Sequence, residues 1–324
     1  GCMDELACNY NEEAINDDGS CDYSCHDNGN YHLSYDGLDD YVILSEPILF
    51  GLNSFSISID CFLKDFNGSD HEPYSYIVGT PLSHTNNDYG FKIQTASNNY
   101  NGGFEVHIND ATTQYFNVIS YNNLNENNVQ LNKWYNLAMV VNRDLNLFEF
   151  YIDGELIESQ NIDNNFGDVD IGIPISIGVM SANFSSLLNG STDNLSIWSK
   201  ALSQEEIQYN MNFDLVGSEE SLVGLWKFNA GEGSMLYDYS GNQNHGFIHD
   251  GSWLESTIND CCLELLGDID CNGEIDISDL IIIIDMILNG ENYEDSQYLC
   301  ADLDLNSEID IADLVILIDL ILNF

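Results

Sequence analysis

The chain has very few basic side chains. Six of its 324 residues are Lys or Arg, against 55 Asp and Glu, and the formal net charge is −49. A nucleic-acid binder needs positive charge to displace the counterions of phosphate, so the charge excludes this class, and anionic membranes would repel the chain. Hydrophobic residues make up 44% of the sequence, so the chain is not a disordered acidic one. The charge is tolerated best where salt screens it or divalent cations neutralise it, which favours a saline, calcium-rich medium outside the cell.

The sequence also lacks several diagnostic segments and motifs. It has no signal peptide and no run of about 20 apolar residues, and because it starts at Gly1 rather than Met we expect a processed or trimmed chain. No G-x-S-x-G elbow, H-E-x-x-H helix, phosphate-binding loop or zinc-spaced Cys pair occurs. His245 and His249 lie in a predicted strand and turn, so we interpret them as structural. These absences predict a protein that is not an enzyme.

Cysteine is present but unevenly placed. Eight of the nine cysteines form two clusters, at positions 2, 8, 21 and 25 and at positions 261, 262, 271 and 300. Disulfides staple short modules outside the cell, so we expect them in these clusters, together with an extracellular or cell-surface location. The sequence does not fix the pairing, although Cys271 and Cys300 are a plausible pair beside two acidic loops. Cys61 lies in FSISIDCFL, in phase with apolar residues, and is predicted to be a core thiol.

An acidic loop followed by an apolar run occurs twice near the C-terminus, with an offset of 34 residues. The two copies read GDIDCNGEIDISDLIIIIDMILNG and ADLDLNSEIDIADLVILIDLILNF. Polar residues recur at positions 1, 3, 5, 7, 9 and 12 of a calcium loop, which are Asp268, Asp270, Asn272, Glu274, Asp276 and Asp279, then Asp302, Asp304, Asn306, Glu308, Asp310 and Asp313. The Glu at position 7 would contribute its backbone carbonyl. A solvated acidic linker is the alternative, but the registered repeat favours two Ca²⁺ ions.

Position 12 is Asp in both loops, and only the helix that follows each loop is strongly apolar. In these features residues 267–324 resemble the type I dockerin module, which implies paired calcium loop-helix units. Two differences from that family stand out: Ile277 and Ile311 occupy positions near the loop end where Ser or Thr is usual, and no Lys or Arg follows Lys227. A standard cohesin partner is therefore not expected. The apolar helices need a further surface, which is either the upstream domain or another copy.

The first 29 residues form a predicted Cys-rich module. GCMDELACNYNEEAINDDGSCDY resembles a short repeat, GCxDxxACNYxxxAxxDDGSCxY, of secreted proteins from marine and related bacteria. No enzymatic role accompanies that repeat. The Asp17–Ser20 turn is interpreted as an exposed acidic turn, with cation binding as the alternative.

Residues 30–260 alternate between apolar and polar residues. SFSISIDCFL, WYNLAMVVN, LFEFYI and NLSIW predict strands with one buried face. Asp153-Gly154 predicts a hairpin, and a capping box at Ser203–Glu206 predicts one short helix to about Met211. LSYDGLDDYVIL, LNKWYNLAMVVNRDLNLFEFYIDGELI and LNGSTDNLSIWSKALSQEEI resemble laminin-G-like, concanavalin-A-type domains. The resemblance implies a mainly β fold, an antiparallel jelly-roll sandwich, followed by a small α-helical, calcium-binding, dockerin-like domain at 261–324.

Candidate ligand residues in the sandwich are fewer. Asp36, Asp39 and Asp40 in the turn DGLDDY, with Asp193, lie where such jelly rolls often hold an ion, so a third Ca²⁺ is a candidate; solvated or turn-capping acids are the alternative. The four Trp are interpreted as core. Sugar stacking would need exposed aromatic rings, and the candidates in Asn-rich stretches are Tyr89, Tyr100, Tyr115 and Tyr121, with ordinary loop tyrosines as the alternative.

Glycosidases of this fold use an E-x-D-x-x-E strand with two carboxylates. The only similar segments, EIDISD and EIDIAD, are halves of the acidic loops and end in Asp, which again argues against an enzyme.

Two functions remain. The first is a secreted, non-catalytic, calcium-binding structural protein that self-associates into a filament or surface layer, or docks through its apolar helices. The second is a carbohydrate-binding adhesin whose dockerin-like module attaches it to a surface scaffold protein. The apolar helices favour the first.

Overall fold

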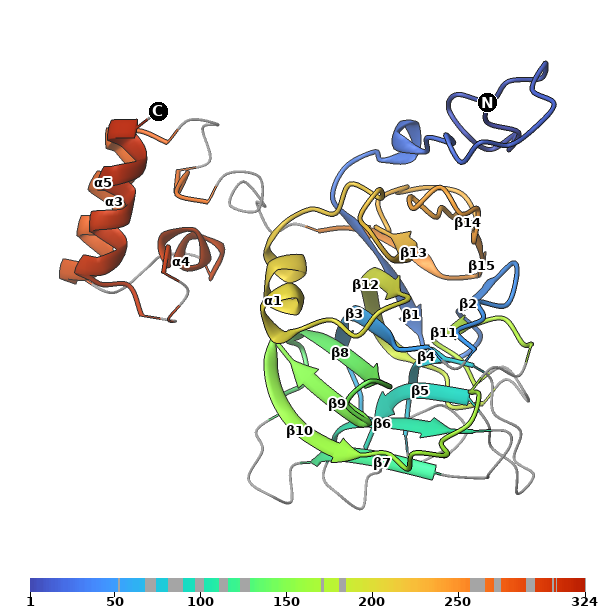
Figure 1. Cartoon of the computed structure of the whole chain (residues 1–324). Helices are drawn as coiled ribbons and strands as arrows, with labels where there is room; N and C mark the ends of the chain where they lie inside the picture. The colour runs from blue at the N-terminus through green and yellow to red at the C-terminus, as the bar shows by residue number, and fades with distance from the viewer. Residues whose placement is uncertain are drawn as a thin grey trace. The chain divides into compact units, whose positions relative to one another are not determined.

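The computed structural model divides the chain into two compact units (Figure 1). The first comprises residues 1–211 and 215–255, and the second comprises residues 212–214 and 256–324. The structure describes residues 1–51, 53–67, 74–80, 90–96, 102–110, 116–122, 129–169, 172–180, 185–256, 266–270, 275–289, 295–304, 306 and 308–323. None of the helices within these residues is both long and apolar enough to cross a membrane.

The first unit is built mainly from antiparallel strands, as the sequence predicts. They are β1 (Tyr31–Asp36), β2 (Tyr41–Leu44), β3 (Phe55–Leu63), β4 (Tyr76–Gly79), β5 (Gly90–Thr95), β6 (Gly103–Asn109), β7 (Phe116–Asn122), β8 (Trp134–Asn142), β9 (Leu147–Ile152), β10 (Glu155–Asn161), β11 (Ser176–Ile177), β12 (Asn189–Trp198), β13 (Leu222–Trp226), β14 (Met235–Leu236), β15 (Gly246–His249) and β16 (Ser252–Glu255). A 3-10 helix, η1 (Ser24–His26), and a helix, α1 (Gln204–Asn212), accompany them.

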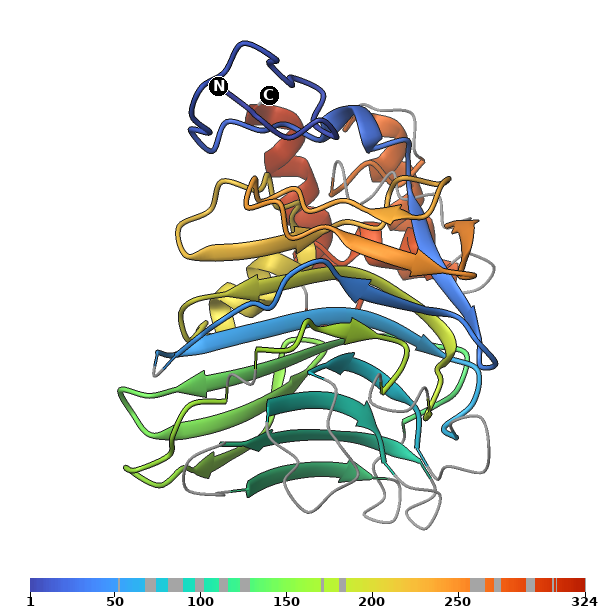
Figure 2. The same ribbon diagram turned by 90° about the vertical axis from the view of Figure 1, so that its right-hand side faces the viewer.

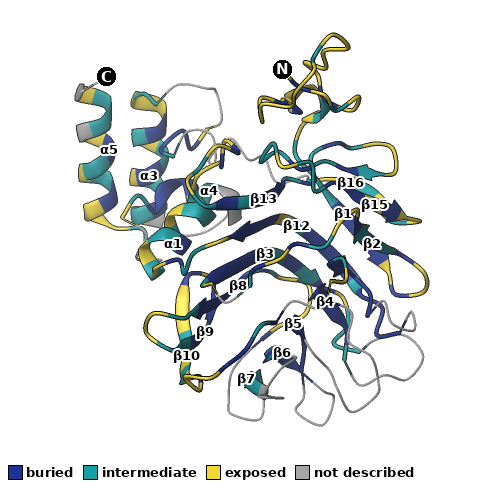
Figure 3. Ribbon diagram, turned by 45° about the vertical axis from the view of Figure 1, so that its right-hand side comes forward, coloured by how far each residue is buried: buried dark blue, intermediate teal, exposed yellow. Residues whose placement is uncertain are grey.

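The strands form two sheets. Sheet A has the order β10-β9-β8-β3-β12-β1-β16, with β13 also paired to β12. Sheet B has the order β14-β15-β2-β11-β4-β5-β6-β7, and β5, β6 and β7 follow one another at its edge (Figure 2). The central strands β3, β8 and β12 are largely buried, whereas β10 at the edge of sheet A is mostly exposed (Figure 3).

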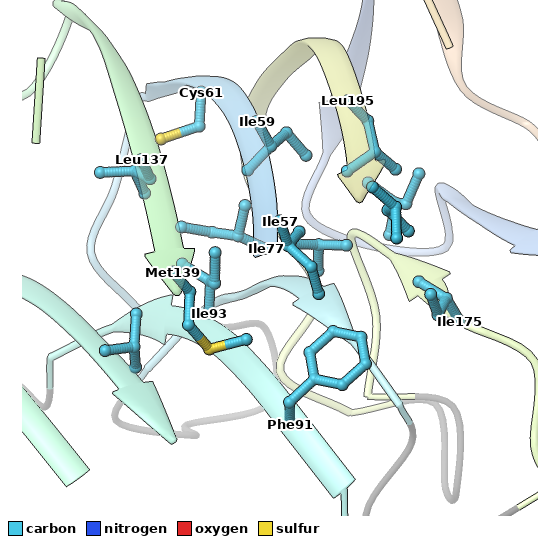
Figure 4. Packing of buried hydrophobic residues seen from close by; sticks show 14 of the residues in the cluster. Ile57, Ile59, Cys61, Ile77, Phe91, Ile93, Leu137, Met139, Ile175 and Leu195 are labelled. Atoms are coloured by element: carbon cyan, nitrogen blue, oxygen red, sulfur yellow. The ribbon is translucent and has the colours of Figure 1, made fainter. Parts of the chain in front are cut away.

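The core lies between the inner faces of the two sheets. In β3 the alternate residues Ile57, Ile59 and Cys61 are each fully buried, because successive side chains of a strand point to opposite faces. They pack against Phe91 and Met139, among others, from both sheets (Figure 4). Cys61 is a buried free thiol, as predicted.

Two local predictions about the chain between residues 150 and 212 are confirmed. β9 and β10 pair directly through Asp153 and Gly154, whose φ angles of 50° and 73° are both positive, as a type I′ turn requires. Ser203 begins α1 with reciprocal bonds: Glu206 N–H donates to its Oγ (3.3 Å), and its own N–H donates to Glu206 Oε2 (2.8 Å). Helix α1 covers part of the outer face of sheet A through Ile207.

The N-terminal disulfide module, residues 1–29, belongs to the first unit. Its disulfides are Cys2–Cys21 and Cys8–Cys25. Asp4 of the module accepts a hydrogen bond from Tyr23 Oη (2.6 Å). It accepts a second (2.8 Å) from Nε2 of His245, which lies between β14 and β15. Because Asp238 N–H donates to Nδ1 of this imidazole, Nε2 carries its proton. His245 is therefore structural, as the sequence indicates.

Within its described residues, the second unit contains the helices α3 (Ile277–Asn289), α4 (Asp295–Ala301) and α5 (Ile311–Asn323). Helices α3 and α5 are the two apolar runs, and Ile283, Met286 and Leu317 are buried between the elements of this unit. Cys300 is disulfide-bonded. Its predicted partner, Cys271, lies outside the described residues.

Candidate functional sites

Each acidic loop of the second unit gathers carboxylates. Ligand oxygens of Asp268, Asp270 and Asp279 all lie within 4.8 Å of one another, and so do those of Asp302, Asp304 and Asp313. These are positions 1, 3 and 12 of each predicted calcium loop. Three carboxylate oxygens this close together match part of the set of about six to eight oxygen ligands that Ca²⁺ takes.

Asp279, in the first turn of α3, accepts the hydrogen bonds around which the first loop folds. Its side chain is 0% exposed. Its Oδ1 accepts the N–H groups of Ile269 (2.6 Å) and Asp270 (3.0 Å), and its Oδ2 accepts that of Asp276 (2.9 Å). These three bonds wrap the loop around the carboxylate and leave it with remaining acceptor capacity.

Asp313 repeats this arrangement in the second loop. It too is 0% exposed, and its Oδ1 accepts the N–H groups of Leu303 (2.8 Å) and Asp304 (3.1 Å). Its Oδ2 accepts the N–H of Asp310 (2.9 Å). The sequence repeat is thus a repeat of hydrogen bonding, which a solvated linker would not maintain.

The remaining predicted loop residues are placed in part. Asn272 and Glu274 lie outside the described residues. Asn306 donates its N–H to Asp302 Oδ1 (3.0 Å) and accepts the N–H of Glu308 at its own Oδ1 (2.7 Å). Asp276 caps α3 by accepting Ser278 N–H at 2.6 Å. These bonds are local turns of the loop backbone, and they leave the calcium assignment a prediction.

The second unit has no cationic side chain that could offset these carboxylates. The last Lys or Arg of the sequence is Lys227 and the last His is His249. At 4.8 Å and an effective dielectric constant of about 20, each carboxylate pair repels by about 3–4 kcal/mol. Hydrogen bonds from the loop N–H groups offset part of this cost.

The turn in the sandwich brings together fewer of its predicted residues. Oxygens of Asp36, Asp39 and Asp40 lie within 4.8 Å of one another. Burial, followed by the neighbouring Asp36 and Asp39 charges, raises the pKa of Asp40, although Asp36 N–H donates to its Oδ2 (2.8 Å). Asp193 pairs with Asp60 in β3, whereas Asp36 pairs with Asn189, four residues along β12. Asp193 therefore does not belong to this turn.

The outer face of sheet B carries a polar cluster that the sequence analysis missed. We call it the Glu105 cluster: Lys92 and Gln94 of β5, Glu105 and His107 of β6, and Ser120 of β7. In register, Lys92 pairs with His107, and Glu105 pairs with Gln94 on one side and Ser120 on the other. Lys92 is 8% exposed and Gln94 is 3% exposed, unusual burial for polar groups on an outer face.

Glu105 organises this cluster. Its Oε2 accepts Gln94 Nε2 (3.1 Å) and His107 Nε2 (3.2 Å), and its Oε1 accepts Ser120 Oγ (3.2 Å). Burial by itself would raise the pKa of Glu105, but the bonds from His107, Gln94 and Ser120 hold it below its ordinary value. Burial, helped by the Lys92 charge, lowers the pKa of His107 to about 4, so its imidazole is neutral at pH 7.

One acceptor in the cluster has no partner. Gln94 Oε1 is buried and makes no hydrogen bond. A buried unsatisfied amide costs about 1–3 kcal/mol, so this atom requires an explanation. The predicted sugar-stacking Tyr89, Tyr100 and Tyr115 lie outside the described residues, and Tyr121 packs against the core. The sequence does contain a signal for this cluster. Residues 92 and 94, and residues 105 and 107, are polar and share one face of their strands, whereas the neighbouring apolar residues point to the other face.

Two packed antiparallel sheets form a sandwich consistent with a jelly roll. The family model described as "Concanavalin A-like lectin/glucanases superfamily" (Laminin_G_3) matches residues 36–208, which is more than half of the chain. The chain therefore belongs to this family, as the resemblance in the sequence implied. No curated protein matches the chain.

Several solved structures match the chain. A Bacteroides ovatus protein described as a "putative carbohydrate binding protein" has 15% identity and a TM-score of 0.54, over 71% of this chain and 61% of its own. A Limulus polyphemus SAP-like pentraxin (14%, TM-score 0.43) covers 55% of this chain and 80% of its own. A Ruminococcus gnavus sialidase CBM40 bound to α2,3-sialyllactose (14%, TM-score 0.39) covers 49% and 83%. At such identities the first match shows the fold.

Proposed function

We propose that this chain is a secreted, non-catalytic, glycan-binding protein whose second unit attaches it to a surface scaffold. The observation that carries the proposal is the Glu105 cluster, a buried row of donors and acceptors with one unsatisfied oxygen, on a sandwich of a lectin-type family. Sugar hydroxyls both donate and accept hydrogen bonds, so they suit such a row. The family and the cluster favour glycan binding over assembly, which reverses the order that the sequence favoured.

The electrostatics of the cluster indicate a neutral sugar. Lys92 and Glu105 carry opposite charges, and His107 is neutral because its pKa lies near 4. A neutral saccharide adds no charge to this buried site, whereas an ionised one would need a further partner. The cluster also contains a single carboxylate, and glycoside hydrolysis by the common mechanisms needs two. Binding without cleavage is therefore proposed.

Glycan-array binding followed by calorimetry tests this proposal. Gln94→Ala and Glu105→Gln should weaken neutral-glycan binding about tenfold or more, because each removes hydrogen bonds at a buried site. Glu149→Gln is the matched control, since Glu149 bonds Ser159 and Tyr151 on sheet A. Wild-type affinity in both cluster variants, or an array without any bound neutral glycan, would refute the proposal.

We also propose that each acidic loop of the second unit binds one Ca²⁺. The support is the duplicated carboxylate geometry in a unit whose sequence holds no basic residue. The Asp36 turn is a third candidate with weaker support. The two disulfides of the N-terminal module support an oxidising, extracellular location for the same protein.

Self-association remains a second candidate function, because each long helix of the second unit carries an exposed apolar stripe. The stripes are Ile277, Ile281, Ile284 and Leu288 on α3, and Ile311, Val315, Ile318 and Leu322 on α5. Their exposed fractions range from 38% to 76%. Exposed positions recur along both helices in Figure 3. The 4-3-4 spacing is that of a helix-packing seam.

Electron microscopy in millimolar calcium, and then in EGTA, tests this second candidate. Ordered polymers that dissolve on chelation would support assembly through the second unit. Monodisperse particles in both conditions would exclude self-association and leave the scaffold role.

A further inference from the structure

The outer face of sheet A carries a group of aromatic rings next to a lysine. We call it the aromatic platform: His32 of β1, Phe62 of β3 and Trp134 of β8, with Lys64 just beyond β3. The Trp134 ring lies 5.3 Å from the His32 ring at 80° and 5.6 Å from the Phe62 ring at 50°. Three strands that are distant in sequence thus deliver their rings to one place.

The aromatic platform is not part of the described cores. The neighbours Leu33, Cys61 and Tyr135 point inward and are buried, so by alternation His32, Phe62 and Trp134 point outward. They are half-buried and belong to neither the sandwich core nor the cluster under α1. The sequence predicts a core position for Trp134, but the alternation of β8 places it on the outer face, where it packs against His32 and Phe62.

Lys64 gives the platform a positive charge. Its ammonium donates to Ser34 Oγ (3.3 Å), on the same face of β1 as His32. Burial, and then the Lys64 charge, lower the pKa of His32. Within the part of the chain that the structure describes, Lys64 makes no ion pair, although the sequence has 55 acidic residues.

We propose that the aromatic platform binds the terminal sugar of a glycan that carries a single carboxylate. The apolar face of the sugar ring would lie against Trp134, and the carboxylate would pair with the Lys64 ammonium. One negative charge matches one ammonium. A polyanion is disfavoured because the net charge of −49 would repel its further charges. This inference is independent of the Glu105 cluster, which lies on the other sheet.

A matched ligand pair tests it: methyl β-D-glucuronide and methyl β-D-glucoside differ by one carboxylate. NMR titration of the whole protein should give about three- to tenfold tighter binding of the glucuronide, the range for a partly exposed ion pair. Lys64→Gln should remove this preference, and Trp134→Ala should abolish glucuronide binding. Lys133→Gln is the lysine control, because Lys133 pairs with Asp153 (3.8 Å).

The outcomes separate this inference from the proposed function. Thermal unfolding should be near wild type in Trp134→Ala, and Trp134→Tyr should retain part of the binding if stacking matters. Equal affinity for the two glycosides in the wild type, or an unchanged glucuronide titration in Trp134→Ala, overturns the platform. Neutral-glycan binding that depends on Gln94 would survive that result.

Discussion

Removal of calcium should unfold the second unit and leave the sandwich folded. In each loop, a carboxylate that is 0% exposed, Asp279 or Asp313, lies within 4.8 Å of two others. Without an ion, these charges repel one another in a unit whose sequence has no basic residue. The sandwich, in contrast, buries a large apolar core between two sheets and does not depend on the loops.

The expected contribution of calcium to the free energy of unfolding follows from mass action. A site with free calcium at about 1,000 times its Kd stabilises the folded state by about 4 kcal/mol, so two sites contribute about 8 kcal/mol. A unit of about 70 residues has a total stability of about 4–10 kcal/mol. If each loop binds one Ca²⁺ as proposed, the two ions would supply most of the stability of this unit, and chelation should leave it unfolded.

Differential scanning calorimetry with calcium and with EGTA measures this effect. We expect two transitions with calcium and the loss of one with EGTA, together with a loss of helical circular dichroism. Asp279→Asn combined with Asp313→Asn should reproduce chelation in the presence of calcium. Asp285→Asn, which removes a charge from α3 outside the loop, should not. Two unchanged transitions in EGTA would refute the calcium assignment.

Three further predictions concern other sites. His107 has a folded-state pKa near 4, below its ordinary 6.5, so protonation favours the unfolded chain. As the pH falls from 6.5 to 4, the sandwich should lose up to about 3 kcal/mol of stability, measured by urea unfolding. The variant His107→Gln should lack this part of the loss. Asp4→Ala leaves the Tyr23 hydroxyl and the His245 imidazole without their acceptor and should destabilise the first unit by about 2–4 kcal/mol in thermal unfolding. Ile284→Asp should abolish calcium-dependent polymers in sedimentation without unfolding α3, because Ile284 is exposed.

Each of these has a matched control. His249→Gln changes an exposed imidazole and should leave the acid sensitivity as it is, whereas equal pH profiles for wild type and His107→Gln would contradict the first prediction. Glu12→Ala changes an exposed acid of the same module as Asp4 and should be neutral. Phe247→Asp places a charge on the exposed sandwich surface and should leave polymers intact; if it dissolved them equally, the apolar stripes would not be the interface.

Local patterns in the sequence predicted the strands and turns well. Alternation through Ile57, Ile59 and Cys61 identifies a strand with one buried face, and the core confirms it. Asp153-Gly154 identifies the hairpin because few residues other than Gly and Asp adopt the required positive φ. Such signals are local: the backbone conformation depends on the residues themselves and their immediate neighbours.

Faces assembled from distant strands were harder to predict. Trp134 looks like a core residue in WYNLAMVVN, and its position depends on the register of β8 against β3, which the sequence does not state. The Glu105 cluster likewise needs the pairing of β5 with β6 and β7 before its five side chains become neighbours. A residue can be assigned to a face from its own strand, but its partners come from strands tens of residues away.

The distribution of basic residues connects the two units to the proposed function. All six lie before residue 228, in the unit that holds the sandwich, and none lies in residues 256–324. Several of them pair or bond within the fold, as Arg143 does with the carbonyls of Phe166 and Gly167. The first unit therefore holds all the basic residues, whereas the second has none. Under the proposed function, a fall in external calcium would unfold the second unit and leave the sandwich folded, so attachment and glycan recognition would respond to different conditions.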